Sequence, residues 1–167
     1  MLVEEAGKRS ELVATAMERL RAAHTEVGGA VISAGGTGSY DRNPVATEIQ
    51  AGSYALMDTA YAKLRLPFRC ALAVLARVVS VGPGYAVADC GLKALGMDHG
   101  NPSIDAAKVW FCSDEHVTFA PEARVRVGDH VRVWPAHVDP TVAYHERLHL
   151  VAGDEVLETW PVDLRGW

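Results

Sequence analysis

The sequence predicts an α/β segment followed by a β domain, with the boundary near residues 64–68. Two observations support this division. Before the boundary, a helix, a glycine turn and a short apolar strand follow one another, which is the order of a parallel αβ unit. After it, short runs rich in Val, Leu and Ala alternate with turn residues, as in a compact antiparallel barrel or sandwich. The predicted domains are 1–66 and 67–167.

Composition and charge exclude several classes of partner. The chain has 167 residues, which is enough for one domain or two small ones with a real core. Its formal net charge of −5 argues against non-specific binding to nucleic acid or anionic lipid, because such binding needs a basic surface. No run approaches the length of a transmembrane helix, and the charged N-terminal stretch is unlike a signal peptide. We therefore expect neither nucleic-acid nor membrane partners.

Three cysteines, Cys70, Cys90 and Cys112, are widely spaced and form no CxxC pair. An odd count without that spacing is typical of reduced thiols packed in a core. The cysteines therefore predict a cytoplasmic protein.

The α/β segment begins with an expected helix over residues 8–25, for which Ser10 is a candidate N-cap. A buried strand is expected at Ala30–Ser33, and a second short strand at 46–50. A parallel barrel or open sheet needs more strands than these two. The two strands therefore predict the end of a larger α/β structure.

Glycine and hydroxyl residues follow both expected strands. The first strand leads into Gly35, Gly36 and Thr37, and the second into Gly52, Ser53 and Tyr54. Glycine lets backbone N–H groups approach an anion, and hydroxyls add donors, so these six residues could form a phosphate cradle. Two ordinary glycine-rich turns would give the same pattern, and both interpretations stay open at this point.

The β domain is predicted from its strand and turn signals. Strands are expected at 68–81, 85–89, 109–119 and 125–134, the last interrupted by a turn at 127–129. A hairpin is expected where 149–151 and 156–162 flank Gly153-Asp154.

His137 and Asp139 are the candidate metal ligands. In an extended segment, residues two apart point to the same side, so this imidazole and carboxylate could share a divalent cation such as Mn²⁺ or Zn²⁺. Two ligands are too few for a closed site, so water or groups from elsewhere would complete it. The alternative is a surface histidine beside a turn-forming Asp-Pro.

Three further stretches carry reactive residue types. The run at 113–116, SDEH, is either an acid/base cluster or a solvated turn, and Lys93 could be a nucleophile only if it is buried. Residues 145–149 spell HExxH, the zinc motif of metallohydrolases. That motif needs a helix, whereas Pro140 lies just before it and a strand is expected just after.

Five stretches, in order, resemble one family. They are SAGGTGSY at 33–40, TEIQAGSYALMD at 47–58, DCGLKALGMDHG at 89–100, SDEH at 113–116 and PAHVDPT at 135–141. Over about residues 8–167 the sequence resembles the C-terminal part of the D-threonine aldolases and related D-serine dehydratases. These are pyridoxal-phosphate enzymes of the alanine-racemase-like fold.

The resemblance implies a fold and a site. The α/β segment would be the C-terminal end of a (β/α)₈ barrel, and an antiparallel β-barrel-like domain would follow it. Gly35, Gly36, Thr37, Gly52, Ser53 and Tyr54 would hold the pyridoxal phosphate at the barrel's C-terminal face. His137 and Asp139 would bind the metal, Mn²⁺ or Zn²⁺; a His-x-Asp pair resembles the aldolase branch, whereas the dehydratase branch tends to have Cys in second place.

The implied reaction is retro-aldol cleavage of a small D-3-hydroxy amino acid to glycine and an aldehyde. The family's Schiff-base lysine lies near the start of the barrel, and no residue here matches it, so no catalytic residue is assigned and Lys93 is not promoted to that role. We therefore expect a fragment that forms a homodimer or associates with a missing N-terminal half. The alternatives are a D-serine dehydratase-like lyase and a non-catalytic β module that binds a partner chain.

Overall fold

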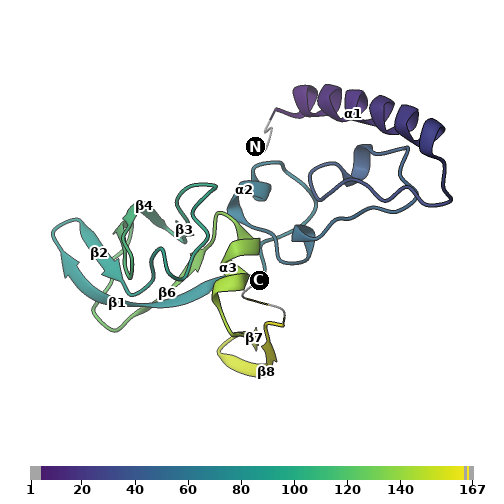
Figure 1. Cartoon of the computed structure of the whole chain (residues 1–167). Helices are drawn as coiled ribbons and strands as arrows, with labels where there is room; N and C mark the ends of the chain where they lie inside the picture. The colour runs from purple at the N-terminus through teal and green to yellow at the C-terminus, as the bar shows by residue number, and fades with distance from the viewer. Residues whose placement is uncertain (1–4, 164, 166–167) are drawn as a thin grey trace. The chain divides into compact units, whose positions relative to one another are not determined.

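The computed structural model describes residues 5–163 and 165, and the chain divides into two compact units, Met1–Ala71 and Leu72–Trp167 (Figure 1). The domain limits predicted from the sequence, 1–66 and 67–167, stay a prediction, because compactness alone does not define a domain. Among the described residues, no helix is both long and apolar enough to cross a membrane. The cytoplasmic location stays a prediction.

The first unit contains two α-helices and two short 3₁₀ helices: α1 (Ala6–Val27), η1 (Tyr40–Arg42), η2 (Ser53–Ala55) and α2 (Thr59–Ala62). The expected helix over 8–25 is present and longer than predicted. Ser10 is not its N-cap, because Glu5 occupies that position and the Ser10 hydroxyl instead donates to the Ala6 carbonyl at 2.9 Å. Hydroxyl groups inside a helix commonly bond back to the preceding turn in this way.

The prediction of two strands in this unit, at 30–33 and 46–50, is wrong. They are reduced to one parallel bridge between Ser33 and Glu48, and Val31 is 64% exposed rather than buried. A two-stranded ladder has little stability without further strands or a covering helix, which explains the short pairing. The bridge is nevertheless parallel, so the glycine-rich loops that follow the two segments leave from the same end.

The second unit is a closed antiparallel barrel followed by a helix and a hairpin (Figure 1). The barrel order is β1-β2-β5-β4-β3-β6, and β7 pairs with β8. The strands are β1 (Val74–Gly82), β2 (Tyr85–Ala88), β3 (Ser103–Ile104), β4 (Ala107–Cys112), β5 (Val117–Pro121) and β6 (His130–Trp134), followed by α3 (Val138–Tyr144), β7 (Arg147–Ala152) and β8 (Glu155–Pro161). The predicted β-barrel-like domain is confirmed.

The barrel core follows from alternation along the strands. In β1, Ala76 and Val78 are buried, whereas Leu75, which points to the opposite side of the strand, is exposed. This alternation is the two-residue period of a strand. Ala86 of β2 is paired with Phe119 of β5, so a small residue faces a large one across the ladder. This pairing of sizes fills the narrow interior of a small barrel.

Several predicted strand limits are corrected by the structure. The run 109–119 is two strands, β4 and β5, because the Ser113 N–H donates to the His116 carbonyl at 2.8 Å and closes a turn between them. The expected strand 68–81 begins only at Val74, and the run 125–134 is strand only from His130. The hairpin at Gly153-Asp154 is confirmed, with Gly153 at φ 61° in the turn.

We predict that Gly91→Ala destabilises the barrel by about 1–3 kcal/mol, the usual cost of overpacking. A Cβ at this position would lie 2.1 Å from the Ser113 carbonyl oxygen and 2.6 Å from the His116 nitrogen, both backbone atoms that cannot move independently. Urea unfolding followed by tryptophan fluorescence measures the loss. Gly7→Ala in α1 is the matched control, since its new methyl group has no close neighbour, and an equal midpoint for both variants would contradict the prediction.

We predict that Cys90 is the least reactive thiol of the native protein. It is buried, and burial, together with the nearby Cys112 and Asp89, raises its pKa to about 12. Because the thiolate is the nucleophile, iodoacetamide at pH 8 should alkylate native Cys90 at least about tenfold more slowly than the urea-unfolded chain. Peptide mass spectrometry gives both rates. Alkylation of native Cys90 as fast as Cys70 or Cys112 would contradict this assignment.

Candidate functional site

His137 and Asp139 lie at the start of α3. His137 is the N-cap, with an extended backbone (φ −138°, ψ 115°), and Asp139 is in the first turn of the helix. The two residues approach each other, with His137 Nε2 3.3 Å from Asp139 Oδ2. The sequence analysis therefore expected His137 and Asp139 to lie close together, as they do, but it expected both in an extended segment. That segment ends at His137, and Asp139 belongs to the helix.

The 3.3 Å separation suits two ligands of one cation. Donor atoms about 2.1 Å from a metal, at angles between octahedral and tetrahedral, lie about 3.0–3.4 Å apart. The side chains are 20% and 63% exposed, so water or substrate can reach the same position. An imidazole nitrogen with a carboxylate oxygen is a donor set that suits Mn²⁺ or Zn²⁺. The residues present therefore fit a divalent metal.

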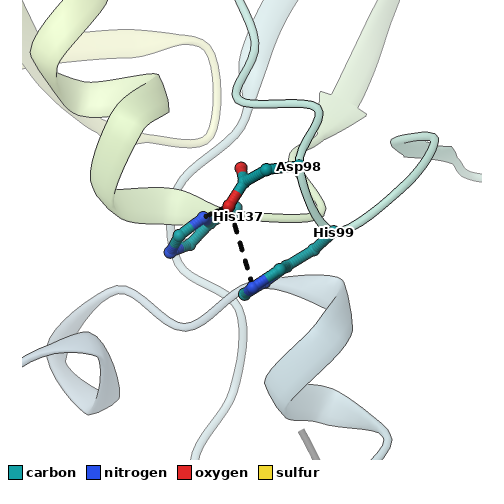
Figure 2. A group of neighbouring side chains, drawn as sticks. All are labelled: Asp98, His99 and His137. Carbon is teal, nitrogen blue, oxygen red and sulfur yellow. Dashed lines mark hydrogen bonds and ion pairs between the residues drawn. The ribbon is translucent and has the colours of Figure 1, made fainter. Parts of the chain in front are cut away.

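The opposite edge of the His137 ring contacts Asp98. His137 Nδ1 lies 2.7 Å from Asp98 Oδ2, the length of a charge-assisted hydrogen bond. The ring of His99 stacks on that of His137 with centroids 4.0 Å apart and planes 15° from parallel. Figure 2 shows the Asp98 carboxylate beside both imidazoles, and His99 Nε2 is 3.8 Å from Asp98 Oδ2.

The carboxyl group of Asp98 is ionised in this environment. Desolvation acts to raise its pKa, but the hydrogen bonds with His137 and with the backbone of Asp98 itself outweigh that effect, so the pKa lies below its usual value. Asp98, His99 and His137 each offer a ligand atom, and these atoms lie within 4.8 Å of one another.

Asp98 and His99 were missed as site residues by the sequence analysis. They stand in the stretch DCGLKALGMDHG, which was noted only for its resemblance to a family. Their partner His137 is 39 residues from Asp98, so no local spacing could reveal the contact. The one available signal was an Asp-His pair directly after a glycine-containing loop.

Asp98 and His137 also line an open hollow of about 520 Å³. Its other walls are apolar or aromatic: Leu92, Leu95, Met97, Pro140 and Tyr144. His137 and Asp98 therefore border a space in which a small organic molecule could lie.

The candidate phosphate cradle, the six residues Gly35, Gly36, Thr37, Gly52, Ser53 and Tyr54, lies on two loops that the structure brings together. The Tyr54 N–H donates to the hydroxyl of the buried Thr37 at 3.0 Å. A Cβ built on Gly36 or on Gly52 meets no heavy atom within 4 Å, so both glycines border open space. Backbone that is bare of side chains, with hydroxyl groups nearby, fits a phosphate group.

Other candidates from the sequence have structural roles. Lys93 is 67% exposed and ion-paired with Glu115, and the hydrogen bond that its ammonium group donates to that carboxylate raises its pKa, so it is a charged surface lysine. The stretch 113–116 is the β4–β5 turn on which Gly91 packs. The HExxH interpretation is wrong, because His149 lies in strand β7 and His145 bonds to the Ala94 carbonyl.

Comparison with known proteins shows which proteins the chain is similar to. Residues 71–151 match the family described as "Putative serine dehydratase domain". The chain is 37% identical over 152 residues to the 3-hydroxy-D-aspartate aldolase of Paracoccus denitrificans, covering 81% of this chain and 39% of that protein. The crystal structure of D-threonine aldolase from Filomicrobium marinum matches with a TM-score of 0.85 at 32% identity, over 93% of this chain and 47% of that one.

The resemblance of this chain to the C-terminal part of the D-threonine aldolases and D-serine dehydratases is thereby confirmed. An alanine racemase-like protein from Idiomarina loihiensis shares the fold, with a TM-score of 0.70 at 23% identity over 91% of this chain and 48% of that one. The predicted fold class, the end of a (β/α)₈ barrel followed by a β domain, is thereby confirmed. The chain spans about 40% of the length of the curated relatives it matches.

Proposed function

We propose that this chain supplies the metal site and the phosphate cradle of a lyase that cleaves D-3-hydroxy amino acids to glycine and an aldehyde. The observation that carries the proposal is the 3.3 Å separation of His137 Nε2 and Asp139 Oδ2 at the start of α3. Relatives named D-threonine aldolase and 3-hydroxy-D-aspartate aldolase support the substrate class. Pyridoxal phosphate and Mn²⁺ or Zn²⁺ are the proposed cofactors.

The proposed role of the cradle is to bind and orient pyridoxal phosphate. Backbone at Gly36 and Gly52 receives the phosphate of the cofactor, and the bond between Tyr54 and Thr37 holds the two loops in register. When bound, pyridoxal phosphate supplies an electron sink for the carbanion left by bond cleavage.

The proposed role of His137 and Asp139 is to hold a divalent ion against the substrate β-hydroxyl. Lewis-acid polarisation of that oxygen favours loss of its proton, which retro-aldol cleavage requires. His137 contributes a neutral nitrogen and Asp139 one negative charge, so the ion keeps part of its positive charge for the substrate. The neighbouring hollow has room for the part of the substrate that leaves as aldehyde.

None of the four lysines, Lys8, Lys63, Lys93 and Lys108, lies in the cradle sequence. Part of the proposal is therefore that the lysine that bonds covalently to the cofactor comes from outside these 167 residues.

A D-serine dehydratase-like lyase is the second candidate, favoured by the description of the family that residues 71–151 match. Product analysis separates the two chemistries, because an aldolase releases glycine and an aldehyde whereas a dehydratase releases ammonia and a keto acid. A partner-binding module is the third candidate, favoured by exposed apolar side chains on the hairpin: Leu150, Val151, Val156, Leu157 and Trp160. A module of that kind would bind neither pyridoxal phosphate nor metal.

We predict that the chain binds pyridoxal phosphate more tightly than pyridoxal, and that Gly36→Ala and Gly52→Ala abolish this difference. The added methyl groups meet no protein atom, so the fold is kept while the space for phosphate is narrowed. Equilibrium dialysis measures both ligands, and Gly7→Ala is the control. Borohydride reduction with peptide mapping should label no single lysine stoichiometrically; one specifically labelled lysine would contradict the proposed external lysine.

We predict that His137→Ala weakens Mn²⁺ binding at least about tenfold, because it removes one of two protein ligands. Electron paramagnetic resonance of free Mn²⁺ during titration gives the affinity. His149→Ala is the matched control, since this exposed imidazole bonds to Thr159 within the hairpin and should leave the affinity unchanged. Equal affinities for the wild type and His137→Ala would place the metal elsewhere and remove the basis of the proposal.

A further inference from the structure

The two nitrogens of His137 have different partners. Nδ1 is 2.7 Å from Asp98 Oδ2, and Nε2 is 3.3 Å from Asp139 Oδ2. The first distance is that of a hydrogen bond between charged or strongly polar groups, and the second is that of two ligands sharing an ion. A neutral imidazole has one proton, so a proton held on Nδ1 leaves the lone pair on Nε2.

We propose that Asp98 is a positioning residue for the metal site: it holds the proton on His137 Nδ1 and so directs Nε2 towards the ion shared with Asp139. The inference rests on the proposed function for the location of the metal. Histidine ligands commonly donate their second N–H to a carboxylate, which fixes the tautomer and strengthens the ligand. His99, stacked on the ring at 4.0 Å, limits its rotation from one face.

The alternative is that Asp98, His99 and His137 themselves bind the ion as three ligands. The distances argue against this arrangement. The 2.7 Å contact of Asp98 with His137 is shorter than the separation of about 3.0–3.4 Å expected of neighbouring ligands, and the 3.8 Å contact of Asp98 with His99 is longer. Of these contacts, only the 3.3 Å distance between His137 Nε2 and Asp139 Oδ2 matches the separation expected of two neighbouring ligands.

The backbone fixes Asp98 in this position. Gly96 forms an antiparallel bridge with His137, and the Gly96 N–H donates to Thr141 Oγ1 at 2.9 Å. The same hydroxyl donates to the His137 carbonyl at 2.7 Å. The loop is therefore held against the first turn of α3 two residues before Asp98, so the backbone that carries Asp98 is positioned without the ion.

The test compares Mn²⁺ affinity in the full chain of Asp98→Ala, Asp98→Asn and His99→Ala, with Asp154→Ala as a control carboxylate at the hairpin tip. We expect Asp98→Ala to weaken binding by about 10- to 100-fold, the usual effect of removing such a partner. Asp98→Asn keeps an oxygen that can accept from Nδ1, so it should recover part of the affinity. His99→Ala and Asp154→Ala should stay within about threefold of the wild type, since neither removes a ligand or the Nδ1 acceptor.

A second readout does not involve metal. Nitrogen NMR of the metal-free protein at pH 8 should show His137 protonated on Nδ1 in the wild type and a mixture of tautomers in Asp98→Ala. An unchanged tautomer together with unchanged Mn²⁺ affinity in Asp98→Ala would overturn the inference. Equal losses in Asp98→Ala, Asp98→Asn and His99→Ala would also overturn it, in favour of the three-ligand site. If His137→Ala binds Mn²⁺ normally, the proposed function fails, and the tautomer alone then decides whether Asp98 positions the ring.

Discussion

The close backbone contact between Gly96 and His137 is the constraint on which the candidate metal site depends. A Cβ on Gly96 would lie 2.3 Å from Pro140 Cγ and 3.1 Å from the His137 carbonyl oxygen, so only glycine allows this approach. Thr141, fully buried, then links the two backbones through one hydroxyl group that both accepts and donates. Because a buried hydroxyl with both bonds made is costly to displace, the loop and the helix behave as one rigid support for Asp98 and His137.

The sequence predicted those parts of the molecule that depend on local signals. Alternation and turn residues predicted the β domain, and Gly153-Asp154 predicted its hairpin, because both depend on neighbouring residues alone. His137 and Asp139 were found for a similar reason, since a spacing of two keeps them close in an extended chain and also at a helix start. Their assignment as ligands stays a prediction, as does that of the phosphate cradle.

The remaining features depend on contacts that no local pattern encodes. Asp98 meets His137 across 39 residues, through a loop whose course is set by Gly96, Pro140 and Thr141. The expected strand at Ala30–Ser33 has apolar residues suited to a sheet, yet only Ser33 is paired, because strand pairing depends on neighbours rather than on composition. Contacts between residues far apart in the sequence therefore explain why Asp98 was missed as a site residue. They also explain why the strand expected at Ala30–Ser33 does not form.

If Asp98 bonds to His137 Nδ1 and does not coordinate the ion directly, there is a chemical consequence for the proposed lyase. A divalent ion bound by His137 and by the single charge of Asp139 would retain a net charge of about +1, whereas Asp98 as a further direct ligand would reduce it to about zero. Polarisation of a substrate hydroxyl depends on that remaining charge. By accepting a hydrogen bond from Nδ1–H, Asp98 would strengthen His137 as a metal ligand without occupying a coordination position. In the proposed lyase, this arrangement would combine firm binding of the ion with open positions for the substrate, which a site closed by four protein ligands would not provide.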